Sequence, residues 1–369
     1  MLTLEPVFKP FARRFAFVLV LVFLAKISIP HAQAQTNYWW DSNDSTAGFG
    51  TAQGTWAAPT TNNATQGWTT DNTGSTTMSG STTIGNDNIN FGTSTNQLGT
   101  GTITVSGNVS ARLINFTASS SNITLSGGNI SLGTSSAITV TNSANTSAIT
   151  QAISSNITLG ASPAWTVNNG GTVGTATLSV SGNVLGGSYG LTKSGNGTLI
   201  LSGAANSWNG TTTVSGGTLT LSGNNTYNGT TTINAGTIEI AAAGRLGAGN
   251  YTGNISNSGT LIHSGTSNQI LGGILSGTGS LTQNAASTLT LSGANTYNGT
   301  TTIKSGTVVI GHATGLGSGG NISFTGGGLQ YGSGITTDIS SRIKNSTLAI
   351  LVDTNGNNVT FASALDSTN

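Results

Sequence analysis

Residues 217–240 read GTLTLSGNNTYNGTTTINAGTIEI, and residues 287–310 repeat this stretch as STLTLSGANTYNGTTTIKSGTVVI. The two copies agree at 18 of 24 positions. A looser copy at residues 197–223 places Trp208 where the later copies have Tyr227 and Tyr297. Because a repeat of this length is one structural unit that buries its apolar face by stacking on its neighbours, we predict a repeat protein.

The composition is far from that of a typical globular enzyme. The 369 residues include 55 glycines and only 5% charged residues, where about a quarter is usual. Aliphatic residues nevertheless alternate regularly with Thr and Ser, and this two-residue period predicts packed β structure rather than disorder. The chain has no cysteine, so disulfides cannot stabilise it.

The N-terminal segment differs in composition from the rest of the chain. Three basic residues between positions 9 and 14 precede an apolar run of eleven residues at 15–25, and AQA follows at 32–34. A membrane span needs about 20 apolar residues, so we predict that residues 1–34 are a signal peptide cleaved after Ala34. An uncleaved N-terminal anchor is the alternative. The chain after Ala34 has eight acidic and six basic residues, which disfavours nucleic acid as a partner.

Residues 35–74 are rich in tryptophan, with Trp39, Trp40, Trp56 and Trp68. These rings could stack on sugars and form a carbohydrate-binding region. They could also cover the open end of the first coil, as a solenoid requires. We favour the cap.

A calcium loop is only weakly indicated in this region. Asp41, Asn43 and Ser45 have its alternate spacing, but the glycine falls at Gly48 rather than at the sixth position and no Glu follows at the twelfth. We therefore predict no metal site from the sequence.

Residues 75–369 read as short strands separated by glycine-containing turns. Strands that begin with Gly-Thr start at Gly197, Gly217, Gly236 and Gly259. Their regular spacing predicts an all-β fold, a parallel β-helix (β-solenoid) with about 20 residues per coil and on the order of fourteen coils. The repeats are clearest at 190–240 and 287–310. The final residues resemble the start of another coil, so we expect the natural chain to continue past residue 369.

Each unit has a predicted inside and outside. Thr218, Thr220, Thr230 and Thr232 should face outward, and the Asn-Gly pairs at 209–210, 228–229 and 298–299 should form corners with positive φ. The 70-residue distance between the two best copies is expected to correspond to about three coils. The aliphatic side chains that we expect to form inward columns are Leu219, Leu221, Ile233, Ile238, Ile240, Leu289, Leu291, Ile303, Val308 and Ile310.

Residues that could support catalysis are few. Enzymes that cleave polysaccharides need neighbouring carboxylates, and Asp338 and Asp353, less than one coil apart, could approach one another to form such a pair. Glu239 should face solvent, and His263 and His312 lack partners at metal-ligand spacing. We therefore predict no enzyme and no cofactor, with a polysaccharide lyase or hydrolase as the alternative.

The motif GTLxLSGxNTYxGxTxIxxGTL resembles the autotransporter-associated β-strand repeat, also called the passenger-associated transport repeat. The resemblance implies a right-handed, single-stranded β-helical passenger, displayed on or released from the surface of a Gram-negative-type bacterium. Family members usually end in an outer-membrane β-barrel, so the resemblance implies that this chain meets membranes through its signal peptide or such a barrel.

Together these features predict an exported, non-enzymatic surface or secreted protein that acts as a stalk, adhesin or matrix component. Its expected partners are host or matrix glycans or proteins. The alternatives are the polysaccharide enzyme and a carbohydrate-binding protein that uses the tryptophan-rich region.

Overall fold

The computed structural model describes residues 34–57, 67–76, 83–118, 121–142, 147–170 and 174–369. The predicted signal peptide, residues 1–34, lies outside this part except for Ala34, as do the gaps within the tryptophan-rich region and the first coils. Residues 35–369 form one compact unit. In the described part no helix has the length and apolar character needed to cross a membrane.

Short parallel strands dominate this unit. In its N-terminal part the strands are β1 (Asn37–Trp40), β2 (Thr55–Ala57), β3 (Trp68–Thr69), β4 (Asn88–Phe91), β5 (Gly101–Ala118), β6 (Ile123–Asn142), β7 (Ile149–Ile153), β8 (Asn156–Leu159) and β9 (Ala164–Asn168). The pairing of β1 with β3 is antiparallel, whereas the pairings of β1 with β4 and of β4 with β5 are parallel.

The central and C-terminal strands are β10 (Ala176–Val180), β11 (Val184–Gly187), β12 (Leu191–Ser194), β13 (Thr198–Leu201), β14 (Ser207–Trp208), β15 (Thr212–Val214), β16 (Thr218–Leu221), β17 (Asn224–Asn225), β18 (Thr231–Ile233), β19 (Thr237–Ala242), β20 (Arg245–Leu246), β21 (Asn250–Tyr251), β22 (Ile255–Asn257), β23 (Thr260–Gly265), β24 (Gln269–Leu271), β25 (Leu275–Ser276), β26 (Ser280–Leu291), β27 (Thr301–Ile310), β28 (Ile322–Phe324), β29 (Gly328–Tyr331) and β30 (Leu351–Asp353). Two 3₁₀ turns, η1 (Gly247–Gly249) and η2 (Ser340–Arg342), are the helical elements of the described residues.

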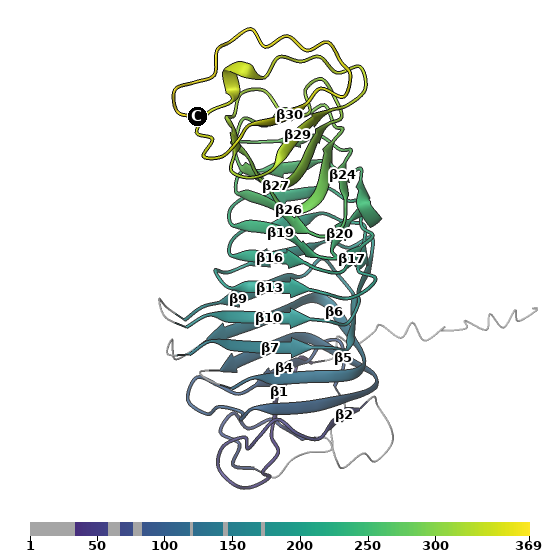
Figure 1. Ribbon diagram of the computed structural model, residues 1–369. Helices are drawn as coiled ribbons and strands as arrows, with labels where there is room; N and C mark the ends of the chain where they lie inside the picture. The colour runs from purple at the N-terminus through teal and green to yellow at the C-terminus, as the bar shows by residue number, and fades with distance from the viewer. Residues whose placement is uncertain (1–33, 58–66, 77–82, 119–120, 143–146, 171–173) are drawn as a thin grey trace, which may run out of the picture. The chain divides into compact units, whose positions relative to one another are not determined.

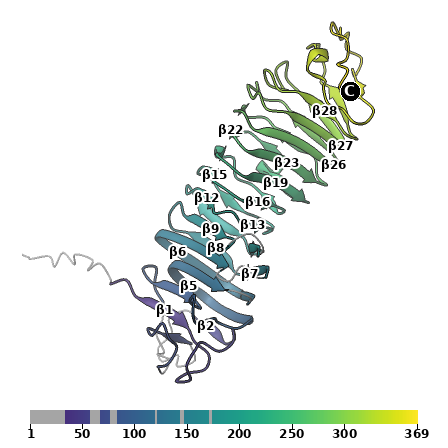
Figure 2. The same cartoon turned by 90° about the vertical axis from the view of Figure 1, so that its left-hand side faces the viewer.

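The strands wind into stacked coils, and the prediction of an all-β parallel solenoid is confirmed. One coil contains β10, β11 and β12, and each of these pairs in parallel with its counterpart β13, β14 or β15 in the next coil. Figures 1 and 2 show the strands of successive coils stacked on one another. The solenoid has about 12 turns of about 22 residues, fewer than fourteen because some N-terminal coils are longer. The coil that leads from Ala137 to its partner Ala164, for example, exceeds this average.

The interior of the solenoid is a set of aliphatic rows. Parallel pairing carries one row through Leu199, Leu219, Ile238, Leu261 and Leu281. The side chains selected as core columns from the sequence all have exposed fractions of 0 or 1%: Leu219, Leu221, Ile233, Ile238, Ile240, Leu289, Leu291, Ile303, Val308 and Ile310. At a strand spacing of about 4.8 Å each side chain contacts the equivalent one in the coils above and below.

The two best copies of the repeat occupy different sides of the coil. Leu289 is the counterpart of Leu219, yet it pairs with Gln269 and Val308 rather than joining the row of Leu219. Three coils lead from Thr218 to Ser280, and the residues between Ser280 and Leu289 lead around one further side. The 70-residue distance was expected to be about three coils, and it is three coils and one further side.

Consistent with this shift, the row of Leu221 leads to Ile303 and on to Phe324, although Ile303 corresponds to Ile233 in the repeat. The residues between Leu221 and Ile303 in this row are Ile240, His263 and Gln283. The start of the motif thus fits two different sides of the coil, since each side needs only an alternation of inward aliphatic and outward polar residues.

The Asn-Gly corners lie between strands as expected, but the reason for their glycines is different. None of the six residues in these three pairs has a positive φ. A Cβ on Gly229 would lie 2.3 Å from the carbonyl oxygen of Gly210, and one on Gly299 would lie 2.0 Å from that of Gly279. The glycines are needed because the backbones of successive coils approach closely here. Among the glycines that precede a threonine at the start of a strand segment, positive φ occurs instead at Gly217, Gly236 and Gly306, but not at Gly197 or Gly259.

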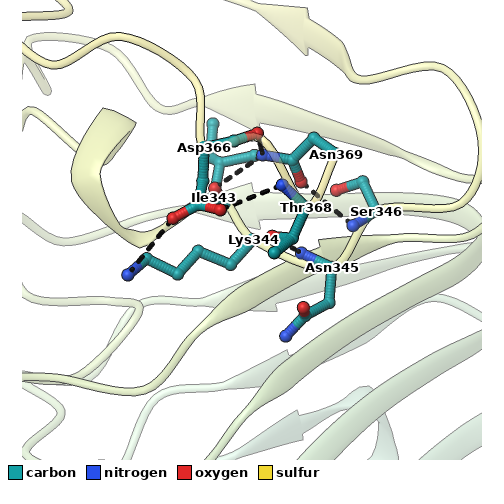
Figure 3. A network of polar contacts seen from close by, with 7 residues as sticks. All are labelled: Ile343, Lys344, Asn345, Ser346, Asp366, Thr368 and Asn369. Atoms are coloured by element: carbon teal, nitrogen blue, oxygen red, sulfur yellow. Dashed lines mark hydrogen bonds and ion pairs between the residues drawn. The ribbon is translucent and has the colours of Figure 1, made fainter.

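The end of the chain stacks by the same rules. Asn345 N donates to Thr368 Oγ1 at 3.0 Å, and Ser346 N donates to Asn369 Oδ1 at 3.0 Å, so the final residues lie one coil beyond residues 343–346 (Figure 3). Lys344 Nζ also lies 3.6 Å from Asp366 Oδ2. Because both charged side chains are about one third exposed or more, this ion pair contributes little.

Candidate functional site

Three of the four tryptophans proposed as a sugar platform are buried. Trp40, Trp56 and Trp68 have exposed fractions of 1% or less, and Trp39 is half-buried. Trp68 packs edge-on against Trp40 and Trp56, with ring centroids 4.7 and 5.5 Å apart. Trp56 Nε1 also donates a hydrogen bond of 2.9 Å to Thr83 Oγ1. These three rings therefore have no free face for a sugar.

Asp338 and Asp353 are held by separate sets of hydrogen bonds. Asp338 Oδ1 accepts from the N–H and hydroxyl of Ser340 at 2.8 and 2.7 Å. Asp353 Oδ2 accepts from Gln330 Nε2 at 2.8 Å, and its Oδ1 accepts from Asn355 N at 2.8 Å. These hydrogen bonds lower the pKa of both carboxyl groups. Both are therefore ionised at neutral pH, and neither is available as a general acid.

Histidines do not form a metal site in the described part of the chain. His263 is buried in the row of Leu221, with Nδ1 2.7 Å from Gln283 Oε1 and Nε2 3.0 Å from Ser267 O. Burial lowers its pKa. His312 contacts Thr314, with 3.0 Å between Nδ1 and Oγ1. Among residues 34–369, apart from the undescribed gaps, no three His, Cys, Asp or Glu side chains come together.

Two of the three aromatic positions of the repeat have threonine partners that the sequence did not predict. At the third position the equivalent threonine, Thr231, contacts the hydroxyl of Tyr251, and the Tyr227 hydroxyl is buried without a partner. Trp208 Nε1 donates to Thr212 Oγ1 at 2.8 Å, and the hydroxyls of Tyr297 and Thr301 are 2.7 Å apart. In both pairs the threonine lies four residues after the aromatic residue and points inward. The constant spacing within the motif was the signal, because a buried Trp or Tyr normally needs a partner for its polar end.

Lys193 is a further polar residue inside the solenoid, with an exposed fraction of 0%. Its Nζ donates to the carbonyl oxygens of Ser194, Gly195 and Gly216 at 2.7, 2.9 and 3.2 Å. Burial lowers its pKa to about 8. The sequence signal was its inward position in the alternation of β12, between the outward residues Thr192 and Ser194.

The outward rows of the solenoid are mostly polar, although Ile200 and Ile262 belong to the row of Thr220. Thr198, Thr218, Thr237, Thr260 and Ser280 form one row along five coils. Glu239 lies on the same outward side but is half-buried, and its Oε1 accepts a hydrogen bond from Ser264 Oγ. The expected outward orientation of the threonines thus holds at Thr218, Thr220, Thr230 and Thr232, which are half-buried or exposed.

A polar groove crosses four successive coils at one corner of the solenoid. We call it the corner groove; its volume is about 520 Å³. The glycines Gly279, Gly299 and Gly320 stack closely along the groove. A Cβ on Gly320, for example, would lie 1.8 Å from the carbonyl oxygen of Gly299. The residues that line the groove are Ser258, Gly259, Thr278, Gly279, Ser280, Asn298, Gly299, Thr300, Gly319, Gly320 and Asn321. Its walls offer hydroxyl and amide groups and carry no charge.

Comparison with known proteins agrees with these features. The model of the passenger-associated-transport-repeat family matches residues 191–220, 216–240 and 281–310. The chain carries passenger-associated transport repeats. The first two matched repeats cover β12 to β19, and the third covers most of β26 and all of β27. No curated protein and no solved structure gives a significant match to the chain.

Proposed function

We propose that this protein is an exported passenger of a Gram-negative type V secretion system and acts as a non-enzymatic stalk or adhesin. The observation that carries the proposal is the combination of the matched repeats with continuous aliphatic rows inside the stacked coils. About half of the residues between 176 and 331 lie in the strands that form this stack. Such a fold presents a long, regular polar surface that can hold or contact a partner.

The charged residues support a role without catalysis. Asp338 and Asp353 are both ionised and are held by their own neighbours, whereas acid–base catalysis needs one carboxyl group with a raised pKa. His263 is inaccessible in the interior. We assign the buried tryptophans of residues 35–74 to a cap that covers the first coil.

The corner groove is the surface that we propose contacts a partner. Asn298, Thr278 and Thr300 are exposed there, and their side chains make no hydrogen bonds within the described chain. Repeated hydroxyl and amide groups without charge suit a neutral, hydroxyl-rich polymer such as a host or matrix glycan. A chain lying along the groove would meet similar groups at each coil, about 4.8 Å apart.

Location and binding can be tested separately. On intact cells that produce the protein, external protease should cleave it and antibody should bind it, or the protein should be present in the medium. Retention of the protein inside the cells would refute export.

For binding, the purified protein is applied to a panel of neutral and acidic glycans. We expect retention without turnover, and weaker retention after Asn298→Ala than after a control change outside the groove, Thr220→Ala. Turnover that Asp353→Asn abolishes would instead support the polysaccharide enzyme.

A further inference from the structure

Two buried oxygen atoms near the N-terminal end of the solenoid lack hydrogen-bond partners. Asp41 follows β1 and has an exposed fraction of 0%. Its Oδ1 accepts a hydrogen bond of 3.0 Å from Asn43 N, but its Oδ2 is buried without a partner. Asn43 Oδ1 is also buried without a partner. A carboxylate oxygen and an amide oxygen act as acceptors, so each of these two atoms lacks a donor or a cation.

The surrounding charge is entirely negative. Burial raises the pKa of Asp41, and repulsion from Asp44 and Asp71 raises it further. Between residues 35 and 111 the sequence has four aspartates and no lysine or arginine. No basic side chain of this segment can therefore neutralise the Asp41 carboxylate, and an isolated buried charge is costly.

We propose that the loop at residues 41–49 binds a calcium ion, with Asp41 Oδ2 and Asn43 Oδ1 as its side-chain ligands. Calcium takes carboxylate, amide and backbone carbonyl oxygens as ligands, together with water. Neither histidine nor cysteine lies in this loop to favour a transition metal. Because two side-chain ligands make a modest site, we expect a Kd of about 10⁻⁴–10⁻³ M, as in extracellular modules.

The bound ion would stabilise the end of the solenoid. Ser42 Oγ already accepts a hydrogen bond from Thr51 N at 3.0 Å and donates one to Thr51 O at 2.7 Å, which closes the loop between β1 and the residues before β2. Trp40, the residue before Asp41, belongs to the buried tryptophan cluster. A cation on Asp41 would therefore tie the loop to the aromatic packing of the first coil.

Terbium is a suitable probe, since it replaces calcium and nearby tryptophan excites its emission. With the purified full chain we expect saturable terbium emission on excitation of tryptophan, and calcium should displace it. Asp41→Asn should abolish this signal. Asp87→Asn is the matched control, because Asp87 is also buried but its two oxygens accept hydrogen bonds from Thr36 N and Ile84 N. The control should keep the signal.

A second variant separates a cation site from a neutral buried carboxyl group. Asn43→Asp adds a carboxylate beside Asp41. If calcium binds, this variant should bind terbium more tightly, and calcium should raise its melting temperature more than that of the parent. Absence of saturable emission from the parent, equal emission from Asp41→Asn, or a melting temperature of Asn43→Asp that does not respond to calcium would each overturn the proposal.

Discussion

Replacing Gly299 with alanine tests the close approach of neighbouring coils. The added Cβ would lie 2.0 Å from the carbonyl oxygen of Gly279 and 2.5 Å from its carbonyl carbon. Both are backbone atoms held in place by stacking, so the coils must separate at this corner to admit the new methyl group. Overpacking of this kind costs about 1–3 kcal/mol. We expect Gly299→Ala to destabilise the protein by the upper part of that range.

The matched control is Gly319→Ala, in the same corner groove. Its added Cβ would meet nothing closer than Asn298 Cβ at 3.8 Å, an ordinary contact, and its φ is not positive. Alanine there restricts the unfolded chain and should be neutral or stabilise by about 0.4–1 kcal/mol. Urea unfolding followed by circular dichroism gives both values, and hydrogen exchange should localise the loss around residues 279 and 299. Equal stability of the two variants would refute the explanation by close approach.

Three further predictions concern the interior. Leu291→Asp should lower the free energy of unfolding by about 4 kcal/mol or more because it buries an unpaired charge. Thr232→Asp, on the outward side, should lower it by about 1 kcal/mol or less. Equal melting temperatures of the two variants would contradict the inward and outward assignment. Thr301→Val should cost about 1–3 kcal/mol, measured by urea unfolding, because it leaves the Tyr297 hydroxyl buried without its partner. Burial lowers the pKa of Lys193 to about 8, so between pH 8 and about 10.4 the unfolded chain keeps a proton on this lysine that the folded chain has lost. The free energy of unfolding should therefore rise with pH over this range. Thermal melting at several pH values should show this rise in the parent protein and not in Lys193→Met.

The fold was predictable because its two determining signals are local. Alternation along each strand assigns the inward side, as at Leu219 and Leu221, and the Gly-Thr starts give the length of a coil. These features persist over many coils and need no knowledge of distant contacts. The number of coils was overestimated because N-terminal coils such as that from Ala137 to Ala164 are longer than the repeats.

The side of the coil on which a motif lies could not be predicted. The side on which a motif lies depends on the lengths of all the corners between the two copies. A single coil that is longer than its neighbours, such as that from Thr237 to Thr260, moves the following motif to a different side. The inward positions of Thr301 and Lys193 were missed for a related reason: residue type suggested the surface, whereas position in the strand placed them inside. Similarly, the glycines of the Asn-Gly pairs were assigned to backbone conformation because contacts between coils are not visible in one repeat.

The shift of the repeat by one side has a consequence for valency. If the chain gained another copy of its 70-residue segment, that copy would turn its Asn-Gly corner toward the third direction, and the next would return to the first. Copies added in this way point around the axis in rotation instead of lining up along one edge. Each of the three directions around the axis would then present the Asn-Gly corner of every third copy. A partner could therefore contact such a corner from any of the three directions.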